Sequence, residues 1–228
     1  MKQFLILAST FLLASCVAIE RNNPDDPGGS NYMGITYEGE TYYAVVIGTQ
    51  TWFKRNLNYA VEGSKCYQNE ETNCATYGRL YDWTTAMALP ASCNTNSCAS
   101  QIKANHKGIC PEGWHIPSDV DWSILMRFVN SSCSNNSSCS DVATKLKATS
   151  GWNNRNGQDT YGFSALPGGN GSTPTSDIPF DNVGYSGNWW SSYEGSAGGA
   201  FYRNMSGEDV LWSNGNKSTL FSVRCLQD

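Results

Sequence analysis

Cysteine is the residue type of this chain with the most chemistry to account for, because a thiol can bind a metal, form a disulfide or carry a lipid. The sequence has nine cysteines, an odd number. A zinc site is disfavoured, since no Cys-x-x-Cys pair occurs and only two histidines, His106 and His115, are present. The role of the cysteines therefore depends on the compartment that the chain enters.

The N-terminus assigns one cysteine to lipid attachment. Lys2 gives a short basic start, and residues 4–13 form a mostly apolar stretch. As a helix this stretch would rise only ~15 Å, about half of the hydrocarbon thickness, which is too short for a transmembrane span. The sequence Leu13-Ala-Ser-Cys16 resembles a bacterial lipobox. We expect residues 1–15 to be a lipoprotein signal peptide and Cys16 to be the lipid-modified first residue; an ordinary secretory peptide with a chance cysteine is the alternative.

The remaining eight cysteines form an even set that would enter an oxidising compartment, where disulfides persist. Eight cysteines allow about 105 pairings. Spacing favours one of them, with three short loops and one long connection from the middle of the domain to its last strand: Cys66–Cys74, Cys93–Cys98, Cys133–Cys139 and Cys110–Cys225.

Catalytic groups are less evident than the cysteines. His115 stands between two large apolar residues just before an expected helix, so we predict a buried hydrogen-bonding role for it rather than catalysis. His106 is predicted to be a solvated loop residue. The acids cluster in turns without an acid/base motif, although a glycosidase pair is left open because the separation in space decides. We expect no enzymatic activity.

Composition narrows the class of protein further. The net charge is −5 and the sequence pI is near 5.0, which argues against binding to nucleic acid or to an anionic membrane surface. Charged residues make up only 15% of the chain while aromatic residues reach 12%. The chain can therefore bury a core, and this excludes a disordered or coiled-coil protein.

The local patterns predict an α+β domain that follows a flexible tether over residues 16–32. Residues 34–37 and 40–47 read as a β-hairpin, and residues 50–53 as a further strand. A helix is expected within residues 77–89, and a stronger one after Ser118, where Ser-x-x-Asp caps an apolar stripe from Trp122 to Val129. A shorter helix should start at Ser140 or Asp141. The second half should hold short strands at residues 162–167, 187–192, 200–203, 209–212 and 220–225.

Several motifs in order along the chain resemble one family, the Fibrobacter succinogenes major paralogous domain. They are Ile47-Gly-x-Gln-x-Trp52, Asn56-Leu57, Gly78-Arg-Leu-Tyr-x-Trp83, Cys110-Pro-x-Gly-Trp-His-Ile-Pro-Ser118, Lys145-Leu-Lys-x-Thr-Ser-Gly-Trp152, Gly162-Phe-Ser-Ala-Leu-Pro-Gly-Gly169, Val183-Gly-x-x-Gly-x-Trp-Trp-Ser-Ser192 and Phe221-Ser-Val-Arg-Cys-Leu226.

This resemblance covers residues 33–228 and implies a C-type-lectin-like fold, shared with formylglycine-generating enzymes. In such a fold the N- and C-terminal strands pair, and two helices flank small curved antiparallel sheets with long loops. A long disulfide near the chain end is common there and agrees with Cys110–Cys225. The resemblance also implies surface display, with adhesion to plant polysaccharide as the suspected role.

Lectin-like folds carry a variable long loop at the place that residues 167–187 occupy in this chain. Exposed rings beside Asn and Asp are the residues that bind sugar faces and hydroxyls. The expected contact residues are therefore Asp177, Asp181, Asn182 and Tyr185, with Asp209 and Trp212 as a second choice. The sequence triplets of calcium-dependent lectins are absent, which argues against calcium. Trp189 and Trp190 are adjacent on a strand, so at least one of them should lie in the core.

The sequence thus predicts a lipid-anchored outer-membrane lipoprotein of the cell surface that acts as a non-catalytic binding or adhesion module. We expect no cofactor and no metal, a membrane contact through the lipid, and a polysaccharide or another surface protein as the partner. The alternatives are a structural coat protein without a small ligand and, last, an enzyme related to the formylglycine-generating enzymes.

Overall fold

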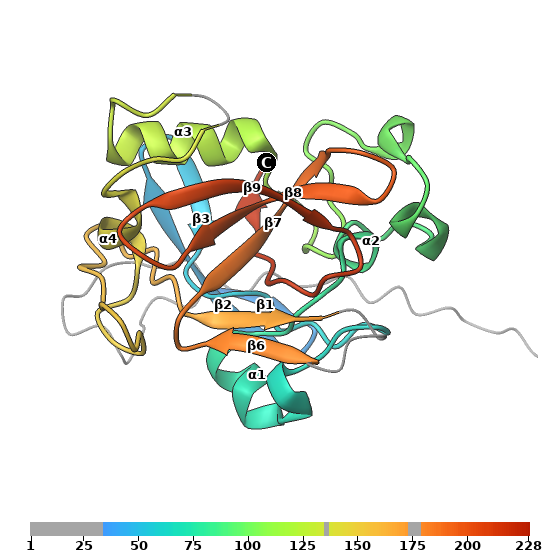
Figure 1. Cartoon of the computed structure of the whole chain (residues 1–228), viewed down its shortest axis with the longest axis horizontal. Helices are drawn as coiled ribbons and strands as arrows, with labels where there is room; N and C mark the ends of the chain where they lie inside the picture. The colour runs from blue at the N-terminus through green and yellow to red at the C-terminus, as the bar shows by residue number, and fades with distance from the viewer. Residues whose placement is uncertain (1–33, 135–136, 173–178) are drawn as a thin grey trace, which may run out of the picture.

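Two five-stranded sheets form the framework of the protein, and neither follows chain order (Figure 1). The computed structural model describes residues 34–134, 137–172 and 179–228, so the predicted signal peptide, Cys16, the tether and Asp177 lie outside the described residues. The first sheet has the strand order β1-β2-β3-β10-β4 and the second has the order β6-β5-β7-β8-β9. The strands are β1 (Gly34–Tyr37), β2 (Glu40–Ile47), β3 (Gln50–Phe53), β4 (Trp114–His115), β5 (Gly168–Gly171), β6 (Phe180–Val183), β7 (Gly187–Glu194), β8 (Gly199–Met205), β9 (Val210–Asn216) and β10 (Leu226–Gln227).

The first sheet joins the start of the described chain to its end. The predicted hairpin of β1 and β2 is confirmed, with Glu38 and Gly39 both at positive φ in the turn, and β3 is confirmed as well. In β10, Leu226 pairs with Trp52 of β3 on one side and with His115 of β4 on the other. The last strand is therefore held between segments from two distant parts of the chain.

The second sheet departs from the expected antiparallel pattern at one place. Strands β7, β8 and β9 form an antiparallel meander, but β5 and β7 pair in parallel through Gly169 and Gly187. Gly169 has a φ of 67°, and a Cβ atom there would lie 2.4 Å from the carbonyl oxygen of Asp181. Asp181 belongs to β6, and only glycine allows the backbones to approach this closely, so the packing of β5 against β6 beside the parallel contact depends on it.

Four α-helices occur among the described residues, more than the two that the family resemblance implies. They are α1 (Glu71–Tyr77), α2 (Trp83–Ala86), α3 (Asp119–Val129) and α4 (Val142–Leu146). The predicted capping box of α3 is confirmed: the Asp121 amide donates to Ser118 Oγ at 3.3 Å, and the Ser118 amide donates to Asp121 Oδ2 at 2.8 Å. The shorter helix α4 is also confirmed, while α1 was not expected.

Three segments differ from their predictions, one helix in its extent and two strands in kind, because their backbone groups pair with distant parts of the chain. The helix expected within residues 77–89 is reduced to α2, since Leu80 pairs with Lys65 and Tyr81 pairs with Phe221. The strand expected over residues 220–225 forms single bridges to three different neighbours instead, and β10 begins only at Leu226. Residues 162–167 likewise contribute one bridge, from Ala165, rather than a strand.

The core is divided between two clusters of buried side chains, and β7 lies between them. Trp189 belongs to the cluster that contains α3 and α4, and Trp190 belongs to the cluster that contains α2. Both rings are fully buried. Neighbouring residues on a strand face opposite sides, so one dipeptide supplies a ring to each half of the core.

A buried amide, Asn56, joins the sheets at the point where these clusters meet. Its Oδ1 accepts hydrogen bonds from Trp189 Nε1 at 2.7 Å and from the Arg224 guanidinium at 2.8 and 3.1 Å. Its Nδ2 donates to the carbonyl oxygen of Tyr77 at 2.8 Å and to Ser222 Oγ at 3.2 Å. One side chain therefore holds the end of β3, strand β7 and the C-terminal segment together.

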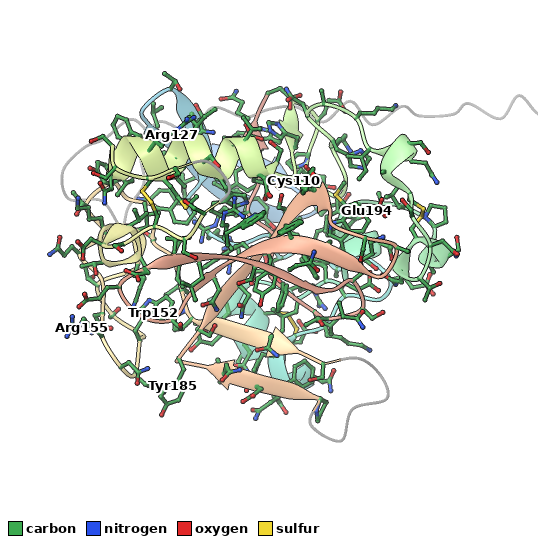
Figure 2. All side chains as sticks on the ribbon, turned by 45° about the horizontal axis from the view of Figure 1, so that its top comes forward. Cys110, Arg127, Trp152, Arg155, Tyr185 and Glu194 are labelled. Carbon is green, nitrogen blue, oxygen red and sulfur yellow. A yellow bond between two sulfur atoms is a disulfide. The ribbon has the colours of Figure 1, made fainter. Side chains whose placement is uncertain are left out.

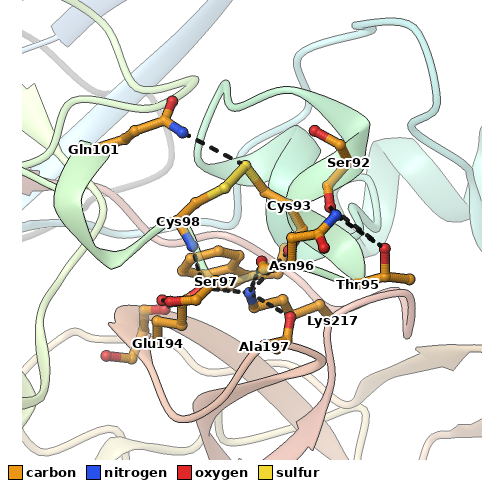
Figure 3. A network of polar contacts seen from close by, with 12 residues as sticks. Ser92, Cys93, Thr95, Asn96, Ser97, Cys98, Gln101, Glu194, Ala197 and Lys217 are labelled. Carbon is orange, nitrogen blue, oxygen red and sulfur yellow. Dashed lines mark hydrogen bonds and ion pairs between the residues drawn. A yellow bond between two sulfur atoms is a disulfide. The ribbon is translucent and has the colours of Figure 1, made fainter.

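A second buried cation, Lys217, fixes the turn that follows β9 (Figure 3). Its Nζ pairs with Glu194 and donates to the carbonyl oxygens of Cys93 at 2.8 Å and Ala197 at 2.9 Å. The ammonium also lies 4.6 Å from the ring centroid of Trp83. Through these contacts the loop that the Cys93–Cys98 disulfide closes packs against the turn after β9 and helps to bury Lys217.

The structure pairs the eight cysteines as their spacing predicts. The Cα–Cα separations are 5.0 Å for Cys66–Cys74, 5.6 Å for Cys93–Cys98, 5.5 Å for Cys133–Cys139 and 5.9 Å for Cys110–Cys225. Three of these bonds close short loops. The fourth spans 115 residues and ties the segment before β4 to the residue before β10.

Loss of the long disulfide should cost more stability than loss of a short one. A chain-entropy estimate gives about 4.8 kcal/mol for the Cys110–Cys225 loop and about 2.2 kcal/mol for Cys133–Cys139. We expect Cys110→Ser with Cys225→Ser to lower the free energy of unfolding about twice as much as Cys133→Ser with Cys139→Ser. Urea unfolding of both double variants measures this, and equal losses would contradict the loop-length argument.

Removal of the Asn56 amide should also be severe. Asn56→Ala leaves the Trp189 indole and the buried Arg224 guanidinium without their shared acceptor, and we expect a loss of about 3–5 kcal/mol. Asn58→Ala is the matched control, because that residue is only partly buried and its side-chain amide makes one hydrogen bond, from Nδ2 to Glu40 at 3.0 Å. The control should cost about 1 kcal/mol or less in the same urea titration. Equal costs for the two variants would show that Asn56 does not have this role.

Candidate ligand groove

The first set of predicted contact residues lies on and just after β6, at an edge of the second sheet. Asp181 and Asn182 are exposed, and Tyr185 is 49% exposed and points outward from the lower edge of the molecule (Figure 2). Asp181 Oδ1 accepts from the backbone amide of Asn182 at 2.8 Å. These three residues are therefore accessible, and they lie close together.

The second set, Asp209 and Trp212, lies elsewhere and is engaged in internal contacts. Trp212 donates from Nε1 to Asp119 Oδ2 at 2.8 Å, and its ring stacks on Phe201 at a centroid distance of 4.5 Å. Asp209 Oδ1 accepts from the backbone amide of Asp141 at 3.3 Å. The structure does not bring these two residues together with Asp181, Asn182 and Tyr185 into one site.

A polar groove opens beside Asn182, and we call it the asparagine groove. It has a volume of about 330 Å³ and takes lining residues from all five strands of the second sheet and from the segment that follows β9. Its lining residues are Asn170, Asn182, Ser186, Asn188, Tyr202, Asn204, Gly215, Thr219 and Phe221. Asparagines from β5, β6, β7 and β8 thus meet in one place.

Strand register explains why the amides converge. Asn188 of β7 lies directly opposite Asn204 of β8, and Trp190 lies opposite Tyr202 two residues further along. Side chains two residues apart share a face of a strand, so Asn204 and Tyr202 point to the same side. Trp212 pairs with Arg203 and therefore lies on the opposite face of the sheet.

Hydrogen bonds between the amides give the groove a fixed floor and an open rim. Asn204 Nδ2 donates to Asn188 Oδ1 at 2.8 Å and to Ser186 Oγ at 2.7 Å, and these contacts form the floor. On the rim, Asn182 Nδ2 donates to Asn170 Oδ1 at 3.1 Å. Asn170 Nδ2 and Asn182 Oδ1 have no hydrogen-bond partner among the described residues. The rim therefore offers one amide donor and one amide acceptor side by side.

The electrostatic character of the groove is neutral. None of its described lining residues carries a charge at neutral pH. Amides, hydroxyls and two aromatic rings supply all of its side-chain chemistry. Such a lining matches a ligand with many hydroxyl groups and no charge better than it matches a phosphate or a metal ion.

A second groove, of about 480 Å³, has Phe180 of β6 and the nearby Ser172 and Pro179 in its lining. Its lining includes Lys65, Asp82, Asn94, Phe180 and Leu220. The Asp82 carboxylate is already used, because its Oδ1 caps α2 by accepting from the Thr85 amide at 2.6 Å. Pro179, Phe180 and Leu220 make this lining more apolar than that of the asparagine groove. The one carboxylate among its described residues, that of Asp82, has a structural role.

Both histidines are held by polar contacts within the protein. His115 is 3% exposed, with Nδ1 at 2.8 Å from Asp228 Oδ1 and Nε2 at 3.5 Å from Asp121 Oδ2. Burial would lower the pKa of His115, but the hydrogen bonds with the two carboxylates outweigh it and the pKa is raised.

His106 was predicted to be a solvated loop residue; it lies in a loop, but its ring is partly buried and hydrogen-bonded. It is half-buried, with Nε2 at 2.8 Å from the Met87 carbonyl oxygen, and its Nδ1 accepts from the Lys103 amide at 3.2 Å. No described serine or cysteine forms a hydrogen bond with either histidine, so neither has the geometry of a nucleophile–base pair.

One group of potential metal ligands occurs among the described residues, formed by Cys66, Glu71 and Cys74. The two thiols are joined in a disulfide, which leaves a single exposed carboxylate. Within the same described ranges, no helix is long and apolar enough to cross a bilayer.

Asn170, Asn188 and Asn204 of the groove were not predicted from the sequence. A signal was present in the strands themselves. The polar residues Ser186 and Asn188 alternate with Gly187 and Trp189 where β7 begins, and Tyr202 and Asn204 alternate with the buried Arg203 and Met205 on β8. Polar residues at every second position of a strand that otherwise carries aromatic residues indicate that one face of the strand lies outside the hydrophobic core.

Comparison with known proteins identifies the family. Residues 45–227 match the Fibrobacter succinogenes major domain, and this range contains all the motifs quoted above. No curated protein and no solved structure matches the chain. Because the match covers most of the sequence, the chain belongs to the Fibrobacter succinogenes major domain family.

Proposed function

We propose that the asparagine groove binds a neutral carbohydrate, and that the protein is a non-catalytic binding or adhesion module. The observation that carries this proposal is a groove lined by four asparagines and two aromatic rings, without a charged side chain among its described lining residues. A neutral sugar presents hydroxyl groups that both donate and accept, and amides can meet both needs.

The dimensions of the groove suit a small part of a glycan. Its volume of about 330 Å³ lies at the lower end of the roughly 300–1,000 Å³ typical of ligand sites. Tyr202 is half-buried and packs on Phe221 at a centroid distance of 4.4 Å, so its ring lies beside the amides. An aromatic ring offers the apolar contact that the CH groups of a sugar need.

We further propose a C-type-lectin-like arrangement for the domain. The features that support it are the two curled sheets, the pairing of the last strand with β3, and the long disulfide at Cys110–Cys225. Sugar binding in this groove would not require calcium, because no carboxylate belongs to its described lining.

The N-terminal sequence supports the location that we propose for the protein. In this proposal Cys16 carries the lipid, residues 16–32 form the tether, and the domain is displayed at the outer membrane of the cell surface. The ligand would then be an external polysaccharide, with plant cell-wall polysaccharide as the first candidate. A lipid anchor suits a protein that holds a cell to an insoluble substrate.

Binding of the chain to neutral polysaccharides tests the proposal. We expect retention on cellulose or a neutral hemicellulose that is unchanged by EDTA. Combining Asn170→Ala with Asn182→Gly should weaken binding about tenfold, since the donor and the acceptor of the rim are lost. Glycine at position 182 keeps the positive φ of 64° accessible. Depletion isotherms on the insoluble polysaccharide measure the change.

Asn154→Ala is the matched control, because Asn154 is exposed and lies outside the groove. It should bind as the unchanged chain does. Tyr185→Ala and Trp212→Ala test the two sets of contact residues that the sequence alone predicts, and so distinguish them from the asparagine groove. Retention that survives the double variant but fails in Tyr185→Ala would place the site on the β6 edge instead. Failure of the unchanged chain to bind any neutral polysaccharide would favour the structural coat protein.

A further inference from the structure

The hydrogen bonds at the floor of the asparagine groove have a fixed direction, because they start at a backbone carbonyl. The Gly169 carbonyl oxygen can only accept, so the Asn188 atom that lies 3.2 Å from it must be the donor Nδ2. Asn188 Oδ1 then faces Asn204 and accepts from its Nδ2 at 2.8 Å. The orientation of both amides therefore follows from the single acceptor at Gly169.

The hydroxyl of Ser186, just before β7, lies where the two amide nitrogens converge. Ser186 Oγ is 3.2 Å from Asn188 Nδ2 and 2.7 Å from Asn204 Nδ2. An amide nitrogen carries hydrogens and has no acceptor capacity, so both nitrogens donate to this oxygen. A hydroxyl oxygen has two lone pairs, and these two bonds occupy them. The Ser186 hydroxyl can therefore make one further hydrogen bond, and only as a donor.

The hydrogen of this hydroxyl has no acceptor among the described residues. Ser186 is 8% exposed and belongs to the lining of the asparagine groove. A buried polar group without a partner costs free energy, so an acceptor that enters through the groove gains this hydrogen bond. The floor thus presents a dedicated donor to whatever occupies the groove.

An apolar surface lies beside this donor. Tyr202 and Phe221 belong to the same lining, and their ring centroids are 4.4 Å apart. Tyr202 lies two residues from Asn204 on the same face of β8, which is about 6.8 Å along the strand. One small substituent that carries both an acceptor and an apolar group can therefore reach the Ser186 hydroxyl and the rings together.

We propose that the floor of the asparagine groove recognises the acetyl group of an acetylated sugar. The acetyl carbonyl oxygen accepts from the Ser186 hydroxyl, and the acetyl methyl packs against Tyr202 and Phe221. This inference rests on the proposed binding of neutral carbohydrate and narrows its substrate class. The group is either an O-acetyl ester or an N-acetyl amide, since both present the same carbonyl and the same methyl without a charge.

Other oxygens of a polysaccharide fit the floor less well. A free hydroxyl that accepts from Ser186 still has its own hydrogen to donate, beside two aromatic rings. A carboxylate accepts without donating, but it would bring a charge into a groove that has no cation among its described lining residues. Ring and glycosidic oxygens carry no methyl group for the rings. The acetyl group alone meets both features of the floor.

Pairs of ligands that differ only in acetylation test this inference on the full chain. One pair is O-acetylated mannan oligosaccharides before and after alkaline deacetylation. The other is chitotetraose and cellotetraose, which share a backbone and differ in the acetamido group. We expect the acetylated member to bind at least about tenfold more tightly in isothermal titration calorimetry, because it adds a hydrogen bond and a buried methyl group. A preference in one pair alone would support the inference and identify the ester or the amide as the source.

Ser186→Ala connects the preference to the floor. This variant should reduce the ratio of the two affinities to about one, because the donor is lost. The ratio compares two ligands in the same variant, so a partial loss of folded protein affects both measurements alike. Ser206→Ala is the matched control: Ser206 Oγ donates to Asn204 Oδ1 at 3.2 Å in the same network, but Ser206 is not part of the groove lining. The control should keep the preference of the unchanged chain.

Three outcomes would contradict this inference. Equal binding of acetylated and unacetylated ligands by the unchanged chain would overturn it and leave the proposed carbohydrate binding intact. An acetyl preference that Ser186→Ala retains would overturn it as well, because the acetyl group would then be recognised elsewhere. Failure of the unchanged chain to bind any of the four ligands or any neutral polysaccharide would overturn the proposed function, and this inference with it.

Discussion

A buried guanidinium without a carboxylate partner is the constraint on which the rest of this fold depends. Arg224 is 1% exposed, and burial lowers its pKa to about 9. Its donors are satisfied by Asn56 Oδ1 and by the carbonyl oxygens of Phe53 and Phe163, and its charge lies 4.4 Å from the Phe163 ring centroid. An uncompensated buried charge costs several kcal/mol, so these neutral acceptors must all be in place when the chain folds. The two sheets and the C-terminal segment are fixed relative to one another by this requirement.

Two other buried cations are also held by carbonyl oxygens against an aromatic ring. This arrangement gives a physical reason for the high aromatic content of the sequence. Lys217 is held by carbonyl oxygens under the Trp83 ring, and it differs from Arg224 in having one carboxylate, Glu194. Lys147 donates to the Gly207 carbonyl oxygen at 3.2 Å and lies 4.1 Å from the centroid of Trp152. A ring face attracts a cation while it still packs as an apolar surface. The aromatic rings thus fill the core and also stabilise buried cations that have few carboxylates near them.

What the sequence predicts well is local, and what it misses is assembled over distance. The β1–β2 hairpin, the capped helix α3 and the short disulfide loops depend on residues close together in the chain, and each is confirmed. Residues 220–225 read as a strand by composition, yet their backbone groups bond to three different neighbours, which no local pattern encodes. The asparagine groove has the same origin, since its amides come from four strands between positions 170 and 204. Asn182 was predicted because its segment reads as an exposed loop, although it lies on β6, whereas Asn188 lies inside a strand that reads as core.

The floor of the asparagine groove contributes to the stability of the fold, whereas its rim presents the free amide groups. Asn188 Nδ2 donates to the Gly169 carbonyl oxygen at 3.2 Å, so the floor is joined to the parallel contact that holds β5 to β7. The rim amides of Asn170 and Asn182 bond to each other and to no other described side chain. Replacing them changes the donors and acceptors presented to a ligand without removing any contact of Arg224 or Asn56. In the proposed binding role, a change at the rim would therefore alter the ligand that is bound, while the buried cation and its acceptors stay as they are.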